Sequence, residues 1–369
     1  MSTSVALYNE FRPYRFEDLF QQHIVESLTH AVKRNDVHPC MIFAGDKGAG
    51  KTTYARTLAM ALNCLNRKPD EVEPCGECES CQLILADNRI HPNVHEINAA
   101  QDTGIDAIRE IEGLYTIIPR VGKYRIFIMD EAHQLSTSAQ NALLKPLEEP
   151  PASVRFILCT TKLAGLLDTI QSRSFIYQFK KIDITRLTKL LEDICGSKGW
   201  EHEVEALRIA ALAAEGSPRN AVKYLSQLHT VGIDVAHAND LLGFSSLGLG
   251  VDILEAVINS NPIGLVKIVD AIASDNKDFS MVLKCLENII YNMIMIAARG
   301  NVDLPPEIIE RLQNIGGIIR ENKQRAALLG APSLLIEMSK EMGYHNIAPK
   351  VVLLSGLLKL ESSFRGEAA

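Results

Sequence analysis

A glycine-rich segment at residues 45–53 constrains the fold of this chain more than any other part of its sequence. It reads Gly45-Asp-Lys-Gly-Ala-Gly-Lys-Thr-Thr53, which fits the pattern G-x-x-x-x-G-K-[ST]. An apolar, strand-like run at 41–44 precedes the segment, and a helix-like stretch at 52–63 follows it. A glycine-rich turn without a ligand would need neither neighbour, so the context favours a phosphate-binding loop between a strand and a helix.

The residues of this loop have distinct tasks in nucleotide binding. Glycines let backbone N–H groups approach phosphate oxygens without the clash of a Cβ atom, and the next helix adds the positive end of its dipole. Lys51 would reach the β- and γ-phosphates, and the Thr52 hydroxyl would bind Mg²⁺. The expected nucleotide-binding residues of the loop are Gly45, Asp46, Lys47, Gly48, Ala49, Gly50, Lys51, Thr52 and Thr53.

Strand-like and helix-like stretches alternate through the first half of the chain. Short apolar runs rich in β-branched residues predict strands at 41–44, 93–97, 124–129, 154–159 and 175–179. Helices are expected between them, at 52–63, 106–115 and 136–145. This alternation is typical of an α/β fold with an open parallel sheet that helices cover on both faces.

After about residue 181 the strand pattern disappears. Short helices are expected at 184–195, 203–214 and 219–228. The run 243–250, Gly-Phe-Ser-Ser-Leu-Gly-Leu-Gly, interrupts the helical periodicity and is the predicted linker, and helical spacing resumes beyond it. The sequence therefore predicts an α/β domain at 1–181, a small helical domain at 182–242 and a helical bundle at 243–369.

Two adjacent carboxylates follow the expected strand at 124–129. Because the same sheet holds the phosphate-binding loop, Asp130 can hold Mg²⁺, and Glu131 can orient or deprotonate the water that attacks the γ-phosphate. A pair that only caps the next helix is the alternative. Thr160 and Thr161 close the following strand, where a hydroxyl, expected to be that of Thr161, could reach the γ-phosphate; a threonine pair in a strand also serves packing.

Four of the cysteines form a cluster. Cys75, Cys78 and Cys81 make a C-x₂-C-x₂-C run, and Cys64 offers a fourth thiolate from the end of the helix after the loop. Four sulfurs suit tetrahedral Zn²⁺, and a cytosolic chain rarely stores cysteines as disulfides. An iron–sulfur cluster is the rival, but ferredoxin motifs continue to a further cysteine and this one does not. His91 or His95 replacing one cysteine is a third arrangement.

The charge balance narrows the classes of partner. Lys and Arg number 38 against 45 Asp and Glu, so the formal net charge is −7. Such a chain does not coat nucleic acid by bulk charge, although a local basic groove inside an assembly is compatible with it. The N-terminus lacks a basic-then-apolar signal pattern, and no uncharged run approaches about 18 apolar residues. We therefore expect a cytoplasmic protein without a membrane span.

Taken together, these motifs resemble those of the gamma/tau ATPase subunits of the bacterial DNA polymerase III clamp loader, which are AAA+ proteins. Beyond the phosphate-binding loop, the matching stretches are Phe11-Arg-Pro13, Phe16-Glu-Asp18, Ala61-Leu-Asn-Cys64, Met129-Asp-Glu-Ala-His133, Asn141-Ala-Leu-Leu-Lys145, Leu147-Glu-Glu-Pro-Pro151, Ser172-Arg173 and Gly216-Ser-Pro-Arg219. The resemblance implies an AAA+ P-loop ATPase domain, a helical lid domain and an all-α collar domain that joins subunits into a ring.

The resemblance also assigns roles to single residues. It implies that Arg173 is the arginine finger that acts on ATP bound to the neighbouring subunit, and that Arg219 senses the γ-phosphate in its own subunit. A guanidinium suits both roles, because it is always charged and can offset charge that develops in phosphoryl transfer. The family places adenine near the N-terminal segment, which implicates Tyr8, Arg12 and Pro13. It also carries a four-cysteine zinc module at 64–81, which implies structural zinc.

The implied function is that of an ATP-dependent motor subunit. ATP binding would favour a spiral formed with delta-like and delta-prime-like subunits and further gamma copies. This spiral would open a sliding clamp at a primer–template junction, and hydrolysis would release the clamp closed on primed DNA. The rivals are an AAA+ motor of the Holliday-junction type, which gives no reason for the cysteine insertion, and a non-hydrolysing scaffold subunit like delta-prime, which lacks a working P-loop.

The chain departs from the family pattern at several positions. Ser174 stands where cysteine is usual, residues 162–165 replace an Asp-Pro pair, and Pro146 follows Lys145 where threonine is usual. Pro146 predicts a helix end or kink, because proline lacks a backbone donor. These departures indicate a divergent member, and its source, cellular or viral, stays open. The chain stops about where the collar should end, as in the shorter gamma form.

Overall fold

The computed structural model describes residues 7–86, 91–101, 111, 113–114, 117–242, 245–274, 279–300, 302, 304, 306–318, 322–343 and 347–366. The chain divides into two compact units, Met1–Val235 and Ala236–Ala369. The first unit holds the sheet together with the helices that follow it. The division of this unit into an ATPase domain and a lid domain therefore stays a prediction.

The first unit is built on a five-stranded sheet with the order β2-β3-β4-β1-β5. All neighbouring strands are parallel, and the strands are β1 (Cys40–Ala44), β2 (Val94–Asn98), β3 (Arg125–Asp130), β4 (Val154–Thr160) and β5 (Phe175–Gln178). In this register Ala44 lies beside Thr160, and Asn98 lies beside Asp130. The carboxyl ends of the strands therefore meet at one edge, and the α/β fold expected from the alternating pattern is confirmed.

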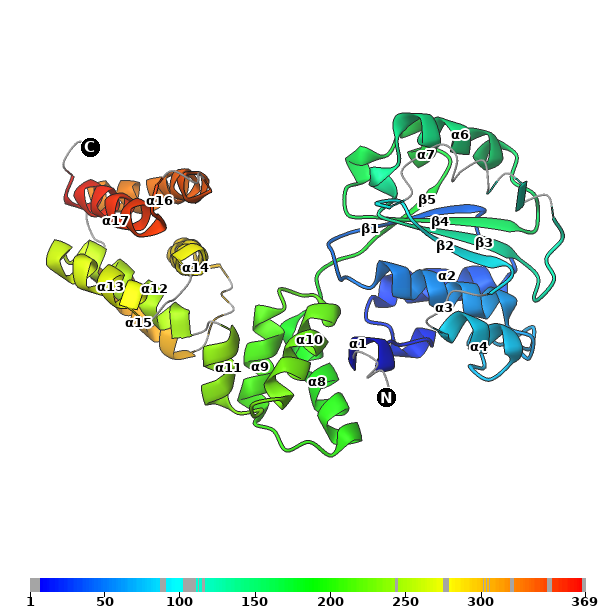
Figure 1. Ribbon diagram of the computed structural model, residues 1–369, viewed down its shortest axis with the longest axis horizontal. Helices are drawn as coiled ribbons and strands as arrows, with labels where there is room; N and C mark the ends of the chain where they lie inside the picture. The colour runs from blue at the N-terminus through cyan, green and yellow to red at the C-terminus, as the bar shows by residue number, and fades with distance from the viewer. Residues whose placement is uncertain are drawn as a thin grey trace. The chain divides into compact units, whose positions relative to one another are not determined.

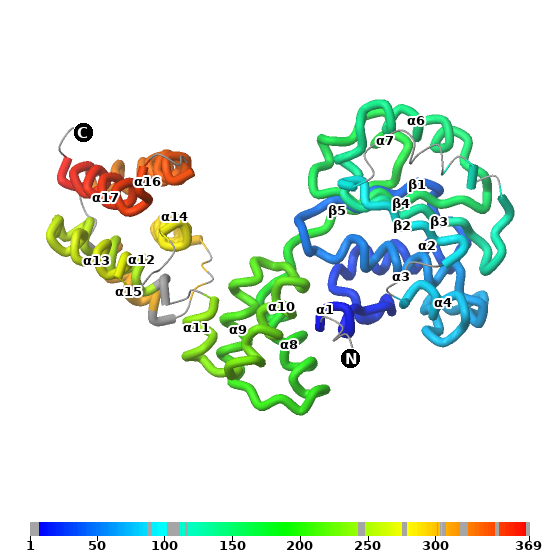
Figure 2. Tube along the Cα trace, viewed as in Figure 1, coloured from blue at the N-terminus to red at the C-terminus, as the bar shows by residue number. Residues whose placement is uncertain are grey.

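Helices cover both faces of the sheet (Figure 1). One face carries α2 (Gln22–Lys33), α3 (Lys51–Asn63) and α4 (Glu79–Leu85), and the other carries α6 (Thr137–Glu148) and α7 (Asp168–Gln171). Alternate residues of β3 explain how both faces are apolar: Ile126 and Ile128 belong to one buried cluster, and Phe127 and Met129 belong to the other. Figure 2 shows the same three layers along the backbone trace.

Three helices complete the described part of the first unit after the sheet. They are α8 (Ile184–Lys198), α9 (Val204–Ala213) and α10 (Pro218–His229), close to the stretches that periodicity predicts. Side chains cap two of them, because Asp183 accepts a hydrogen bond from the backbone N–H of Arg186, and Ser217 accepts one from Asn220. Their apolar sides form a small core that includes Leu191, Leu207 and Leu225.

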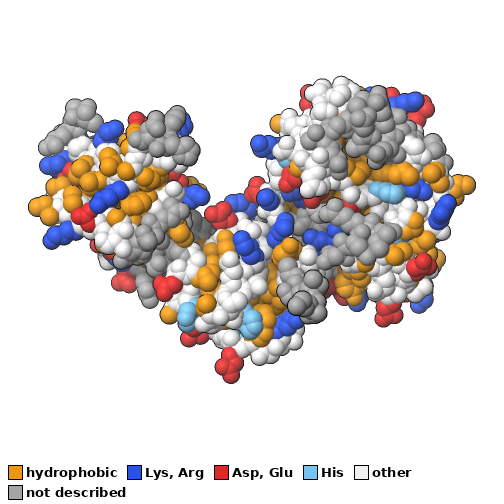
Figure 3. All heavy atoms as spheres, in the orientation of Figure 1, with side chains coloured by type: hydrophobic (Ala, Val, Ile, Leu, Met, Phe, Trp, Pro, Cys, Tyr) orange, Lys and Arg blue, Asp and Glu red, His pale blue; other side chains and the backbone are white. Residues whose placement is uncertain are grey.

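Every regular element described in the second unit is a helix. The helices are α11 (Val235–Leu242), α12 (Ser245–Ile258), α13 (Pro262–Ser274), α14 (Phe279–Ala297), α15 (Pro306–Ile318), α16 (Asn322–Met342) and α17 (Pro349–Arg365). Leu254, Leu286 and Leu353 are fully buried in their shared core. Figure 3 shows that hydrophobic side chains also remain on the visible surface of this unit. The predicted helical bundle is thus present in the described residues.

The predicted linker at 243–250 is wrong over its described residues, because helix α12 already begins at Ser245. Gly250 is buried there, and a Cβ atom at this position would lie 3.2 Å from Ile289 and 3.6 Å from the Cys285 backbone. The glycine therefore allows α12 to approach α14 closely instead of making the chain flexible.

Other expectations for single elements have mixed outcomes. The helix expected at 106–115 lies largely outside the described residues. Helix α6 does not end at Pro146; it continues to Glu148, so the proline lies in its last turn. Helix α14 is long and apolar enough to cross a membrane by length and composition alone, although it contains Lys284 and Glu287 and so is not an uncharged run. Part of it, including Leu286 and Ile289, is packed in the core of the second unit.

Candidate functional site

The phosphate-binding loop leaves β1 and leads directly into α3, as the motif predicts. Gly50 is the N-cap of α3 and adopts a left-handed conformation with φ of 95°, which glycine adopts without strain. Gly48 is left-handed as well, and a Cβ atom there would collide with the Ser217 hydroxyl at the start of α10. The glycines thus let the loop close tightly against the helices after the sheet.

Lys51 lies within this loop with 6% of its surface exposed. Its Nζ atom donates 2.8 Å hydrogen bonds to the carbonyl oxygens of Gly45 and Asp46. Burial lowers the pKa of Lys51, while the neighbouring acidic groups, among them Glu131 and Asp130, act in the opposite direction. The ammonium group is therefore held at the loop that is expected to surround the phosphates.

The two predicted magnesium ligands lie next to each other. Thr52 Oγ1 donates a 3.2 Å hydrogen bond to Asp130 Oδ2, and the other carboxylate oxygen of Asp130 accepts from the backbone N–H of Glu131 at 3.1 Å. Hydroxyl and carboxylate oxygens are the ligands that Mg²⁺ prefers, usually beside waters and substrate phosphates. The pair therefore fits a Mg²⁺ ion that a nucleotide would share.

Glu131 follows the end of β3 in an uncommon backbone conformation. Its φ is 51°, in the left-handed region that non-glycine residues seldom occupy. The carboxylate accepts a 3.2 Å hydrogen bond from Thr161 Oγ1, and His133 Nδ1 lies 3.5 Å from the same oxygen. Backbone strain of this kind is often found at functional sites. The structure thus brings Thr161 to Glu131, as a partner of the carboxylate.

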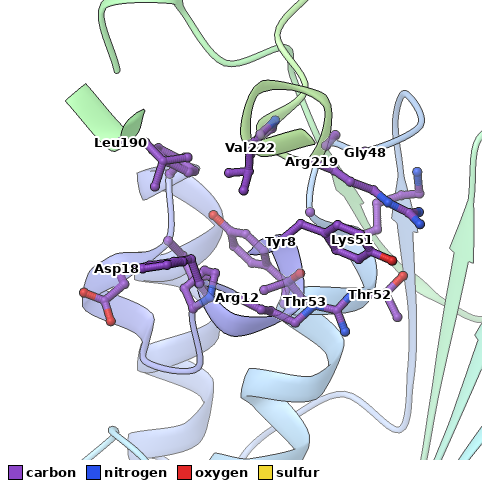
Figure 4. A pocket seen from close by; sticks show the side chains of 18 of the residues that line it. Tyr8, Arg12, Asp18, Gly48, Lys51, Thr52, Thr53, Leu190, Arg219 and Val222 are labelled. Atoms are coloured by element: carbon purple, nitrogen blue, oxygen red, sulfur yellow. The ribbon is translucent and has the colours of Figure 1, made fainter. Parts of the chain in front are cut away.

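A pocket of about 650 Å³ lies between the loop, the N-terminal segment (residues 7–19) and helices α8 and α10 (Figure 4). Asp18 and Leu190 lie at one end of it and Lys51 and Thr52 at the other. The predicted residues that line the pocket are Tyr8, Arg12, Pro13, Lys47, Gly48, Ala49, Gly50, Lys51, Thr52, Thr53, Asp130, Glu131 and Arg219. Its volume suits a nucleotide-sized ligand.

Residues that sequence reasoning missed complete the wall opposite the loop. Helix α8 contributes Lys189, Leu190 and Asp193, and α10 contributes Val222 beside the predicted Arg219. The guanidinium of Arg219 lies 5.1 Å from the centre of the Tyr8 ring, a cation–π distance. Val222 could have been predicted from the sequence, because it lies three residues after Arg219 and so on the same face of the helix.

Arg173 and Thr161 are not among the described residues that line this pocket, and neither are Gly45 and Asp46. Arg173 Nη2 instead forms a 2.8 Å ion pair with Glu148, and Nη1 donates to the Thr169 carbonyl. The side chain is 36% exposed. Arg173 is therefore not part of the lining of the pocket in its own chain.

The four clustered cysteines converge on one point. The Sγ atoms of Cys64, Cys75, Cys78 and Cys81 all lie within 4.8 Å of one another. The pairs Cys75–Cys81 and Cys64–Cys78 are each 4.0 Å apart, close to the roughly 3.8 Å edge of a tetrahedron with Zn–S bonds of about 2.3 Å. All four are free thiols. This donor set fits a structural Zn²⁺ ion.

Backbone groups around the cluster support thiolate sulfurs. The Cys75 sulfur accepts from the N–H groups of Cys78 and Glu77, and the Cys78 sulfur accepts from that of Leu65. Burial raises the pKa of Cys78, but several hydrogen bonds outweigh burial and bring it to about 7. Among the described residues, the group that could hold a metal contains cysteines only.

The two histidines weighed as replacement ligands have other partners. His91 is buried and bonds to the Ser80 hydroxyl and the Asn93 backbone. His95 stacks on Phe127 with ring centres 5.2 Å apart. Both residues therefore serve the core of the first unit.

Comparison with known proteins finds similarity to subunits of DNA polymerase III. A family model described as "DNA polymerase III, delta subunit" matches residues 20–183. A Mycobacterium bovis DNA polymerase III subunit gamma/tau is 31% identical over 320 residues, which cover 84% of this chain and 55% of that protein. A Bacillus subtilis subunit tau is 38% identical over 238 residues, covering 64% of this chain and 42% of that protein.

Two solved structures match this chain at lower sequence identity. The Thermotoga maritima RuvB Holliday junction branch migration motor is 18% identical, with a TM-score of 0.47, covering 72% of this chain and 86% of that one. A Bacillus subtilis clamp loader delta protein is 14% identical, with a TM-score of 0.40, covering 91% and 99%.

A third relative is also named as a DNA polymerase III subunit. The Escherichia coli subunit tau is also 30% identical over 304 residues, which cover 80% of this chain and 47% of that protein. The chain thus spans about half the length of the curated relatives that it matches. It is therefore a homologue of the bacterial proteins named DNA polymerase III subunit gamma/tau, and the resemblance that its motifs indicate is confirmed.

Proposed function

We propose that this chain is an ATP-hydrolysing subunit of a sliding-clamp loader for DNA replication. The observation that carries the proposal is the hydrogen bond between Thr52 and Asp130 at the end of the pocket formed by the phosphate-binding loop. It joins two predicted Mg²⁺ ligands beside Lys51 and next to Glu131. This arrangement supports hydrolysis of a nucleoside triphosphate, since the loop lysine, the Mg²⁺ ligands and the carboxylate for the attacking water come from one chain.

The residues of the pocket would divide the work of phosphoryl transfer. Lys51 would leave the loop carbonyls to contact the β- and γ-phosphates. Thr52 and Asp130 would hold a Mg²⁺ ion, which offsets phosphate charge when it is bound. Glu131 would orient or deprotonate the attacking water, with Thr161 fixing its carboxylate. Arg219 would report the γ-phosphate, because it lines the same pocket.

Arg173 would act on the nucleotide of a neighbouring subunit. Its absence from the lining of its own chain's pocket and its partial exposure support this role. A finger that acts in trans leaves an isolated subunit without part of the charge that stabilises the transition state. Slow hydrolysis by the isolated chain follows from this arrangement.

The partners follow from the relatives, which are named as subunits of DNA polymerase III. The ring would contain delta-like and delta-prime-like subunits and further copies of this chain. It would load a clamp onto primed DNA in the cytoplasm and would not bind a membrane. Zn²⁺ in the cysteine cluster would hold the insertion between α3 and β2 together and would take no part in hydrolysis.

The two rival functions make different predictions. A scaffold subunit that does not hydrolyse ATP would not need Lys51, Thr52 and Glu131, which this chain retains. Titration of the purified chain with a fluorescent ATP analogue, compared with Lys51→Ala, tests the proposal at its first step. Parent binding that Lys51→Ala weakens supports it, and equal or absent binding contradicts it. A Holliday-junction motor would not respond to a sliding clamp.

A further inference from the structure

The cysteine-rich insertion (residues 64–81, the zinc module) contacts the segment that forms one wall of the nucleotide pocket. The contacts come from Glu73 and Gly76, between the first two cysteines and within the cysteine run. They reach Tyr14, Phe16 and Glu17, in the N-terminal segment. The module thus lies directly behind residues that a bound nucleotide would meet.

Glu73 holds the backbone of this wall. Its Oε2 atom accepts a 2.8 Å hydrogen bond from the N–H of Phe16, and Oε1 accepts a 3.1 Å bond from the N–H of Glu17. These donors begin the short 3₁₀ turn Phe16–Asp18. Two charge-assisted bonds from one half-buried carboxylate fix both the position and the orientation of that turn.

Gly76 receives the Tyr14 ring. A Cβ atom at Gly76 would lie 2.8 Å from Cε2 of Tyr14 and 3.2 Å from its hydroxyl, so the ring rests on the glycine backbone. Gly76 itself has a left-handed φ of 73°, and its carbonyl accepts a hydrogen bond from Gln82. Cys75 directly before Gly76 and Cys78 two residues after it both belong to the cysteine cluster.

Tyr14 and Glu17 also line the proposed nucleotide pocket. Regular structure in the segment is limited to α1 (Leu7–Glu10) and the 3₁₀ turn, so its order depends on contacts with other parts of the chain. Phe16 and Leu19 are anchored in the core, and Glu73 and Gly76 of the zinc module contact the pocket-lining residues Glu17 and Tyr14.

We propose that Glu73 and Gly76 are positioning residues for nucleotide binding, through which zinc in the cysteine cluster raises the affinity of the pocket for ATP. The inference rests on the proposed nucleotide site. It predicts a selective effect, because the loop that contacts the phosphates is built separately, from β1 and α3. Recognition of the nucleoside should depend on the module, and recognition of a bare triphosphate should not.

The first test measures ligand binding to the full chain. A fluorescent ATP analogue and inorganic triphosphate are titrated with Mg²⁺ into the parent, Glu73→Ala and Glu77→Ala; Glu77 is an exposed carboxylate on the same module. We expect Glu73→Ala to weaken binding of the ATP analogue about tenfold. This is the loss expected if the wall of the pocket were ordered in only about one molecule in ten. In Glu73→Ala, the affinity for triphosphate and the zinc content should stay within twofold of the parent values. Glu77→Ala should match the parent in all three measurements.

A second test removes the zinc from the parent with a chelator and measures hydrogen exchange as well as binding. Exchange of the Phe16 and Glu17 amides should accelerate more than tenfold, and the ATP analogue should bind more weakly, while triphosphate binding is kept. Unchanged affinity of zinc-free protein for the ATP analogue would overturn the inference, and so would an equal loss of both ligands.

The two assays distinguish failure of the proposed function from failure of the proposed role of the zinc module. If the zinc-loaded parent fails to bind the ATP analogue, the proposed function fails and this inference fails with it. If the parent binds and Glu73→Ala binds as tightly, only the role of the zinc module is wrong.

Discussion

Thr52 Oγ1 donates a 3.2 Å hydrogen bond to Asp130 Oδ2, although the two residues lie 78 positions apart in the chain. The sheet topology explains the contact. Helix α3 begins shortly after β1, and β3 ends at the same carboxyl edge of the sheet. The bond joins the phosphate-binding loop to Asp130, the proposed Mg²⁺ ligand, so the candidate site depends on the parallel topology and not on sequence neighbours.

Thr52→Ala should weaken Mg²⁺-dependent ATP hydrolysis by at least about 10- to 100-fold, the range expected when support of a metal ligand is lost. Thr52→Ser keeps the hydroxyl and should retain most of the activity. The measurement is the ATPase rate as a function of Mg²⁺ concentration. Equal loss in both variants would show that the methyl group, and not the hydroxyl, is required.

Arg173→Ala should leave ATP affinity within about twofold of the parent and reduce stimulated turnover about 10³-fold, the contribution of an arginine finger in related chemistry. The ion pair with Glu148 is partly exposed, so its loss should change the free energy of unfolding by less than about 1 kcal/mol. Binding and steady-state ATPase assays check both parts. Loss of ATP binding in the variant would mean that Arg173 serves the pocket of its own chain.

Each chain should hold one Zn²⁺ ion, measured by metal analysis of the purified protein. Cys78→Ser should lose the zinc and unfold at a lower temperature, because binding of a structural metal contributes to folding. Cys195→Ser is the matched control, since Cys195 is buried in the small helical core and lies outside the cluster. Iron with a visible absorbance in place of zinc would favour the iron–sulfur alternative.

His91 should make the first unit sensitive to acid. Burial lowers the pKa of His91 from 6.5 to about 4, so between these values the unfolded chain binds more protons than the folded one. Stability is therefore lost as pH falls from about 6.5 towards 4, by up to about 3 kcal/mol for this residue. Urea unfolding at pH 7.5 and pH 5 should show a smaller difference for His91→Gln than for the parent.

The exposed His30 gives the control for that comparison, because His30→Gln should keep the pH dependence of the parent. If His91→Gln also keeps it, the acid sensitivity comes from other groups.

Much of the fold could be predicted from the sequence because the signals are local. Apolar runs of strand length mark β1 to β5, and the glycines of the phosphate-binding loop are explained by the backbone conformation at Gly50. The cysteine spacing likewise places the three sulfur atoms of Cys75, Cys78 and Cys81 close together within a short segment. In these cases the residues that determine the structure lie close together in the chain.

The misses have the opposite cause. Gly250 looked like part of a linker because its role, close approach to Ile289 on another helix, is not visible in its own neighbourhood. Leu190 and Val222 line the pocket only because α8 and α10 pack across from the loop. The contacts of Glu73 with Phe16 and Glu17 span 57 and 56 positions, and no periodic pattern in the sequence predicts them.

We propose above that this chain hydrolyses ATP as part of a clamp loader. The most direct test is the steady-state ATPase rate of the purified chain alone, and then with partner subunits, sliding clamp and primed DNA. We predict slow hydrolysis by the chain alone and a large stimulation that needs clamp and primed DNA together and is lost in Arg173→Ala. Equal rates in all mixtures would contradict the account.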